Sequence, residues 1–150
     1  MNEFKHQIIK AINDELQERL KNAQQSYRDA KESRDHETKS SAGDKHETGR
    51  AMMQQEMDHT EARIHQLQSF INEFKSLPVE EETDIVLPGS VVQTNIGCYF
   101  IGLSLGKVLV DDWFIQAISI ASPLGKLLLR KTVGEEVMLN NSVQKIKNIF

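Results

Sequence analysis

Two runs of apolar residues at helical spacing, separated by a polar stretch, constrain the fold of this chain most strongly. In the first run, apolar or small residues recur every three or four positions, which is the spacing of one helix face. These residues are Ile9, Ile12, Leu16, Leu20, Ala23, Tyr27 and Ala30. The intervening positions are mostly good helix formers, and residues 2–34 contain neither proline nor glycine. We therefore expect one long helix from Asn2 to about Arg34.

A second run repeats this spacing after the polar stretch. It consists of Met53, Met57, Thr60, Ile64, Leu67, Ile71 and Phe74. The threonine alone interrupts the apolar seam, and Pro78 ends the pattern. Two helices of about thirty residues, each about 45 Å long at 1.5 Å per residue, should pair antiparallel as a coiled-coil hairpin. We expect residues 1–77 to form this hairpin and both runs to be its mutual core.

The polar stretch itself, ETKSSAGDKHETGRAMM from Glu37 to Met53, holds the first candidate site. Its small and polar residues cannot form a core, so residues 35–47 are expected to be the tip of the hairpin. Asp44 and Glu47 are three positions apart and lie near one helix face if the second helix begins around Asp44. Mg²⁺ prefers carboxylate oxygens and keeps several waters, so one or two carboxylates suffice to assist it. Alternatively, Asp44 is an N-cap and Glu47 its capping-box partner.

Basic residues surround this acidic pair. They are Arg34, Lys39, Lys45 and Arg50. We expect them to steer the tip toward RNA phosphates or acidic protein groups, although a solvated loop of mixed charge explains each of them equally well. The nearby histidines do not follow a metal-ligand spacing on one helix face, which argues against a structural zinc site.

After an acidic linker at residues 78–85, the composition becomes typical of β-strands. Runs rich in β-branched and aromatic residues predict strands at 90–94, 98–105, 113–119, 136–139 and 143–149. Turns are expected at 95–97, 106–107, 111–112 and 140–141. Ser122 as N-cap and Pro123 at the first helical position predict one short helix. Residues 86–150 should therefore form a small antiparallel sheet with one covering helix, and the chain as a whole is expected to be α+β.

Composition excludes several classes of function. With 150 residues and a net charge of −4, the chain has no sequence-independent attraction to nucleic acid. The single cysteine, Cys98, rules out an internal disulfide framework, and we interpret it as a quiet structural thiol in a strand. No apolar run approaches the ~20 residues of a membrane span, and residues 1–10 lack the apolar core of a signal peptide. We expect a cytoplasmic protein with no membrane partner.

Two motifs connect the chain to a known family. The first is Ser122-Pro123-Leu124-Gly125-Lys126-Leu127-Leu128-Leu129, followed by Gly134-Glu135-Glu136-Val137. The second is Gly43-Asp44-x-x-Glu47. In these motifs, in length and in the order of its parts, the chain resembles the Gre transcript-cleavage factors of bacterial RNA polymerase. The resemblance covers nearly the whole chain and implies a coiled-coil hairpin followed by an FKBP-like domain.

The resemblance also implies a mode of action. The C-terminal domain, through Ser122, Pro123, Leu124, Gly125 and Lys126, docks beside the secondary channel of the polymerase. The hairpin then reaches the active site, where Asp44 and Glu47 help to hold a Mg²⁺ shared with the polymerase, and the polymerase cuts the 3′ end of backtracked RNA. On this view the protein is a monomer and not an enzyme, and it binds no cofactor alone.

The tip departs from the family pattern, which leaves alternatives open. In Gre factors the acidic pair is usually followed by Asn, a further acid and an aromatic residue, whereas here the positions carry Thr48, Arg50 and Ala51, and Lys45 replaces an apolar residue. One alternative is a regulator or inhibitor that occupies the secondary channel without promoting cleavage. Another is a coiled-coil adaptor that dimerises through its heptads and binds other proteins.

Overall fold

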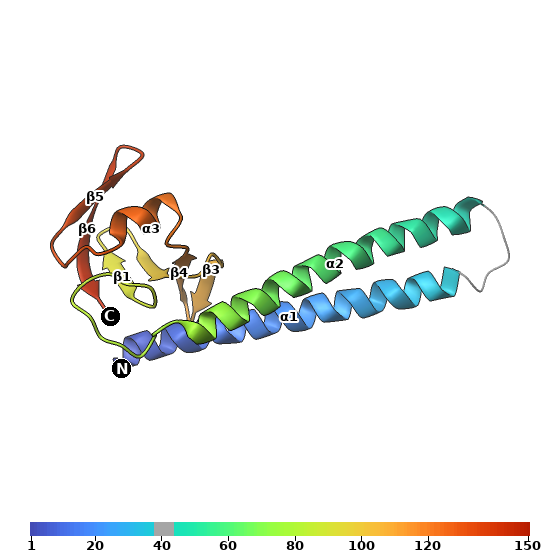
Figure 1. Ribbon diagram of the computed structural model, residues 1–150, viewed down its shortest axis with the longest axis horizontal. Helices are drawn as coiled ribbons and strands as arrows, with labels where there is room; N and C mark the ends of the chain where they lie inside the picture. Colours follow the sequence, from blue (N-terminus) through green and yellow to red (C-terminus); the bar gives the residue numbers. More distant parts are fainter. Residues whose placement is uncertain (38–43) are drawn as a thin grey trace. The chain divides into compact units, whose positions relative to one another are not determined.

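The computed structural model of the chain describes residues 1–37 and 44–150. Two long helices come first, α1 (Glu3–Glu37) and α2 (Asp44–Ser76). Six strands and a short helix follow, in the order β1 (Val91–Thr94), β2 (Cys98–Ile101), β3 (Gly106–Val110), β4 (Trp113–Ile118), α3 (Pro123–Leu128), β5 (Glu136–Leu139) and β6 (Ser142–Ile149) (Figure 1). The fold is α+β, which confirms the predicted class. In the described part of the chain, no helix is both long and apolar enough to cross a membrane.

Contacts divide the chain into two compact units. One unit combines Met1–Glu15 with Asn72–Phe150, and the other is Leu16–Ile71. The start of α1 and the end of α2 therefore belong with the sheet. The change in composition at residues 78–85 marks where the β-rich sequence begins, whereas the boundaries of the units lie inside the two helices.

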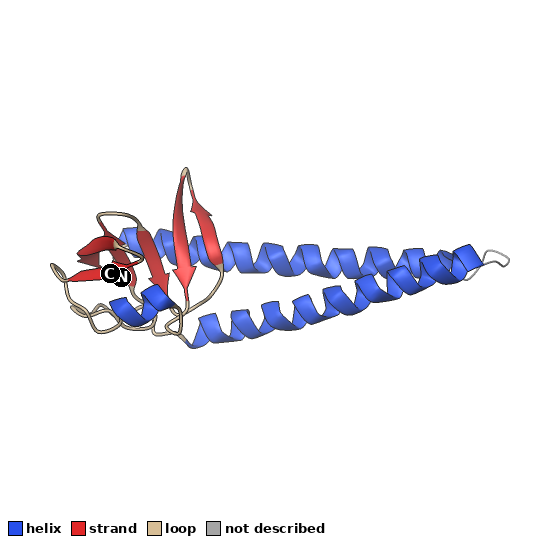
Figure 2. Cartoon of the chain, turned by 90° about the horizontal axis from the view of Figure 1, so that it is seen from above, coloured by secondary structure: helices blue, strands red, loops and turns tan. Residues whose placement is uncertain are grey.

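The second unit is the pair of long helices, which lie side by side in both views (Figures 1 and 2). Its buried side chains come from the two predicted runs, and are Leu16, Ala23 and Ala30 on α1 and Met57, Thr60, Leu67 and Ile71 on α2. The other predicted positions in this unit, Leu20, Tyr27, Met53 and Ile64, are half-buried. The hydroxyl of the buried Thr60 donates to the carbonyl of Glu56, one turn back along the helix. The one polar residue of the seam is thereby satisfied without a partner on the other helix.

Near the start of α1 the buried face differs from the predicted one. Ile8 is fully buried, whereas Ile9, which the spacing placed on the core face, is half-buried. Lys5, Ile8 and Ile12 are the fully buried side chains of this segment, at steps of three and four. The correction has a simple physical cause, because this end of α1 belongs to the unit that contains the sheet.

The strands of the first unit form one six-stranded sheet in the order β3-β4-β2-β1-β6-β5. Four neighbouring pairs are antiparallel, as predicted, but β2 and β4 are parallel. The predicted strand 98–105 ends at Ile101, and the predicted turn at 106–107 is instead the start of β3. Gly102 and Gly106, with φ of 132° and 82°, redirect the chain between the two strands. The chain then returns through β4, which inserts between β3 and β2 and so runs parallel to β2.

Different elements pack against the two faces of this sheet. On one face a cluster of buried side chains joins the sheet to α3, and consists of Val86, Val92, Tyr99, Ile101, Leu124, Leu128, Val137 and Ile146. Phe100 lies between Tyr99 and Ile101 and points to the opposite face, because side chains alternate along a strand. There its ring contacts that of Phe74, at the end of α2, with centroids 5.9 Å apart.

The start of α1 is joined to the sheet by an aromatic cluster and one buried lysine. The ring of Phe4 stacks on Trp113, with centroids 5.4 Å apart and planes 4° from parallel, and it also contacts Phe150 at 5.1 Å. Lys5 is buried, and its Nζ donates to the carbonyl of Glu81 over 3.0 Å. Burial lowers the pKa of Lys5, while the nearby carboxylates of Glu82 and Glu81 act in the opposite direction.

Candidate functional site

The acidic pair lies where α2 begins. Because α2 starts at Asp44, Glu47 follows one helical turn later, which is the condition for the two carboxylates to lie near one face. Glu47 is exposed. The side chains of Asp44 and Lys45, and the whole of Lys39 and Gly43, lie outside the described residues. The bounds of α2 place Asp44 at the first helical position, whereas the capping interpretation needs it directly before that position.

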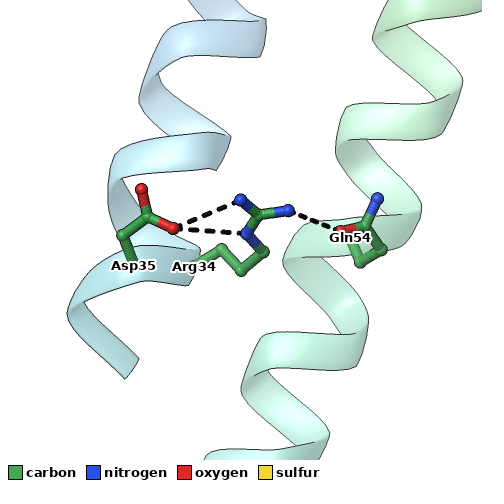
Figure 3. A network of polar contacts seen from close by, with 3 residues as sticks. All are labelled: Arg34, Asp35 and Gln54. Atoms are coloured by element: carbon green, nitrogen blue, oxygen red, sulfur yellow. Dashed lines mark hydrogen bonds and ion pairs between the residues drawn. The ribbon is translucent and has the colours of Figure 1, made fainter. Parts of the chain in front are cut away.

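Arg34, one of the predicted basic contacts, belongs to a network that joins the two helices (Figure 3). Its Nη1 donates to Oε1 of Gln54 on α2 over 2.7 Å. Its Nε and Nη2 lie 3.4 Å and 3.2 Å from a carboxylate oxygen of Asp35. The amide of Gln54 in turn donates to Asp58 over 3.0 Å. Arg34 therefore links the two helices close to the end of the helix pair.

Arg50 differs from Arg34 because its side chain is exposed. It follows Glu47 by three positions on α2, so the two side chains lie near the same face of the helix. An exposed Glu and Arg in this relation attract each other weakly. The carboxylate proposed to assist a metal thus has a cation of the same chain as its neighbour.

Among the described residues, no group of three or more His, Cys, Asp or Glu side chains is placed to hold a metal. The exposed carboxylate of Glu47 and the helical position of Asp44 fit a shared Mg²⁺ site, in which most of the ligands come from a partner and from water.

The motif around α3 serves the fold at four of the five positions that were predicted to dock. Ser122 is the N-cap, and its Oγ accepts from the backbone N–H of Gly125 over 3.0 Å and donates to the carbonyl of Ser119 over 2.7 Å. Pro123 occupies the start of the helix, and Leu124 is buried in the core. Gly125 is required by close contact, because a Cβ there would lie 2.0 Å from the carbonyl oxygen of Ser119. Of the five side chains, those of Pro123 and Lys126 are exposed.

Cys98 is a half-buried thiol at the start of β2. Burial raises the pKa of its thiol to about 12, and the backbone N–H of Tyr99 acts weakly in the opposite direction. At neutral pH the thiol is therefore protonated and a poor nucleophile. This agrees with the interpretation of Cys98 as a structural residue.

Sequence reasoning missed a surface on β3 and β4. Leu109 and Phe114 face each other across the two strands and are 53% and 59% exposed. The Nζ of Lys107 lies 5.9 Å from the centre of the Phe114 ring. Because residues 106–107 were assigned to a turn, the alternation of exposed and buried residues along β3 went unnoticed. That alternation, in Gly106–Val110, is the signal that predicts a half-exposed strand.

No family model matches the sequence, and no curated protein or solved structure matches it either. The resemblance to Gre factors therefore depends on two short motifs and on the order of a helical and a β-rich part. The α3 motif is described in full, and its serine, proline, leucine and glycine all have roles within the domain. Of the tip motif, the structure describes the start of α2 and the side chain of Glu47.

Proposed function

We propose that this protein is a Gre-like transcription elongation factor. It binds RNA polymerase, inserts the end of its helix pair into the secondary channel, and stimulates the polymerase's own cleavage of backtracked RNA. The observation that carries this proposal is the start of α2 at Asp44, which sets Asp44 and the exposed Glu47 one turn apart at the end of the helix pair. The protein lends two carboxylates and is not itself an enzyme.

The chemistry of the pair suits this role. A second Mg²⁺ stabilises the attacking or leaving oxygen in phosphodiester cleavage. Carboxylate oxygens at the beginning of α2 supply the hard ligands that Mg²⁺ prefers, and the polymerase and water supply the others. Asp44 and Glu47 thus act by holding the ion and by orienting a water molecule, and the bond is broken in the active site of the polymerase.

The network at Arg34 supports accurate placement of these carboxylates. Gln54 lies seven residues after Glu47 on α2, about two helical turns away. By binding Gln54 from α1, Arg34 limits the sliding of one helix past the other near the acidic pair. A metal-assisting group benefits from such support, because small displacements of a ligand weaken catalysis strongly.

For docking, we assign the direct contacts to the exposed members of the α3 motif. Pro123 and Lys126 present their side chains to solvent, whereas Leu124 and Gly125 are buried. Ser122 is engaged in capping the helix. Pro123 supplies a rigid apolar contact, and Lys126 supplies a positive charge for an acidic surface of the polymerase.

A second function, occupation of the channel without cleavage, is favoured by one observation. Arg50 is exposed three positions after Glu47, where its guanidinium attracts the same carboxylate that a Mg²⁺ needs. A cation at this position also repels a metal ion. Such a protein slows elongation by blocking the secondary channel and leaves backtracked RNA uncut.

A transcript-cleavage assay on stalled elongation complexes separates the two functions. We expect the purified protein to accelerate RNA cleavage, and the double variant Asp44→Asn, Glu47→Gln to lose that acceleration while it still binds the polymerase. Glu56→Gln, which changes an exposed carboxylate about two and a half turns after Glu47 on α2, is the matched control. If the double variant cleaves as well as the wild type, the proposed role of the acidic pair is wrong. Slower elongation without cleavage supports the channel regulator instead.

A further inference from the structure

The outer edge of β3 is an open pairing surface. β3 is the first strand of the sheet and has β4 as its neighbour. Val110 and Trp113 flank a two-residue turn and form a hydrogen-bonded pair, and such pairs alternate with non-bonded ones along an antiparallel ladder. The backbone N–H and C=O groups of Lys107 and Leu109 therefore point away from β4. Within residues 1–37 and 44–150, no hydrogen bond reaches these groups.

The side chains beside this edge are apolar and uncovered. Leu109 and Phe114 form an exposed cross-strand pair. Lys107, on the same face, lies over the Phe114 ring and so extends across the sheet. An edge with free backbone groups next to exposed apolar side chains is the combination that favours the addition of another strand.

We propose that two copies of this chain associate by antiparallel pairing of their β3 strands. Pairing Lys107 with Leu109 of the second copy, and Leu109 with Lys107 of the second copy, forms four backbone hydrogen bonds between the outward-pointing groups. Val108 of each chain then lies at the two-fold axis. This is a closed, symmetric interface in which both copies use the same surface. It differs from the monomer that the resemblance implies.

Charge complementarity identifies the second copy as the occupant. In this register Lys107 has two diagonal neighbours in the second copy, Asp111 and Lys107, so the interface holds two contacts of opposite charge and one of like charge. To reach Asp111, the Lys107 ammonium turns away from the Phe114 ring. The two-fold axis repeats the contact with Asp111, which gives two ion pairs. A lysine on an edge strand ordinarily prevents pairing, because its charge is left without a partner in the added strand. A second copy of β3 supplies an opposite charge, the carboxylate of its Asp111.

The opposite edge of the sheet lacks this complementarity. β5 and β6 also carry an exposed apolar pair, Met138 and Val143. By the same reasoning, the backbone groups of Glu136 and Met138 point outward from β5. Self-pairing there sets Glu136 diagonal to Asn140 and to Glu136 of a second copy. The cation opposite Glu136 is Lys145 of the same chain, and this register places no cation of the second copy beside Glu136. The inference therefore applies to β3 alone.

Sedimentation velocity of the full chain at increasing concentration tests the proposal. We expect a reversible dimer. We expect Lys107→Glu and Asp111→Lys each to raise its dissociation constant roughly tenfold or more, since each variant turns both diagonal contacts between positions 107 and 111 into contacts of like charge. An equimolar mixture of the two variants should dimerise again, because the mixed pair contains only opposite charges at both contacts. Lys126→Glu, an exposed lysine on α3, should dimerise like the wild type.

Three results overturn the proposal. They are a chain that stays monomeric at all concentrations, a dimer that is unchanged in Lys107→Glu, and a mixture that fails to restore pairing. Asp111 has a φ of 54°, which strains a lysine, so circular dichroism must show that the variant is folded. If it is not, Asp111→Asn tolerates this backbone conformation and should still weaken the dimer by removing the charge.

Discussion

Arg34 on α1 and Gln54 on α2 form a hydrogen bond of 2.7 Å between the two long helices. The partners lie twenty positions apart in sequence, and the guanidinium is held from its other side by Asp35. Apolar contacts become sparse near this end of the helix pair, since Ala30 is the last buried residue of α1 among those with a described side chain. The bond therefore fixes the alignment of the helices where packing contributes least.

Removal of this bond should loosen the helix pair slightly. We expect Gln54→Ala to lower the free energy of unfolding by about 0.5 kcal/mol, because the bond is exposed and its net contribution is small. Urea denaturation followed by circular dichroism measures the change. Gln55→Ala, at the neighbouring exposed position, controls for the change in helix propensity. Equal stability of the two variants would show that the bond contributes nothing.

Gly125 and Gly134 offer a matched pair of glycine substitutions. A Cβ at Gly125 meets the carbonyl oxygen of Ser119 at 2.0 Å, whereas a Cβ at Gly134 meets nothing within 4 Å. We expect Gly125→Ala to destabilise the protein by roughly 3 kcal/mol, because α3 must move off the sheet. Gly134→Ala should cost only about 1 kcal/mol, since its φ of 91° is the one source of strain. Denaturant titrations of the two variants test this order, which a milder effect at Gly125 contradicts.

Features set by local pattern were predictable from the sequence. The helical spacing of the two runs predicts α1 and α2, and Ser122 with Pro123 predicts the start of α3. The prediction for β5 is correct at both ends, because Gly134 and the Asn140-Asn141 turn bound it. In each case a residue adjacent in sequence supplies the physical signal.

Features set by distant contacts were not predictable. The stacking of Phe4 on Trp113 joins residues that are far apart in the sequence, and it turns the start of α1 toward the sheet, so that Ile8 is buried in place of Ile9. The parallel pairing of β2 with β4 depends on the position of β3, which resembled a turn in the sequence. At the candidate site, the sequence predicted the residue types, whereas the engagement of Arg34 with Gln54 required the structure.

Arg50 allows the two proposed functions to be separated by a gain of activity. If Glu47 assists a Mg²⁺, Arg50→Glu should increase transcript cleavage by at least about twofold, because it removes a nearby cation and adds an acid beside the metal. The increase should be largest at low Mg²⁺ concentration. Arg63→Glu, an exposed arginine further along α2, makes the same charge change away from the tip and should have no effect. An Arg50→Glu variant that still slows elongation without cleavage argues for the channel regulator.

Cys98 gives a prediction for alkaline pH. Burial raises the pKa of the folded thiol to about 12, from an ordinary value of 9.0. The folded state therefore holds its proton in a range where the unfolded state has lost it, and the stabilisation present below pH 9 is lost as the pH rises toward 12. We expect the free energy of unfolding to fall across this range, and to fall less steeply in Cys98→Ala, as measured by urea titrations at a series of pH values.

Alkylation of Cys98 by iodoacetamide at pH 8.5 should be more than about a hundredfold slower in the native protein than in urea, because so little thiolate is present in the folded state. Equal rates in the two states would show that Cys98 is accessible and its pKa ordinary.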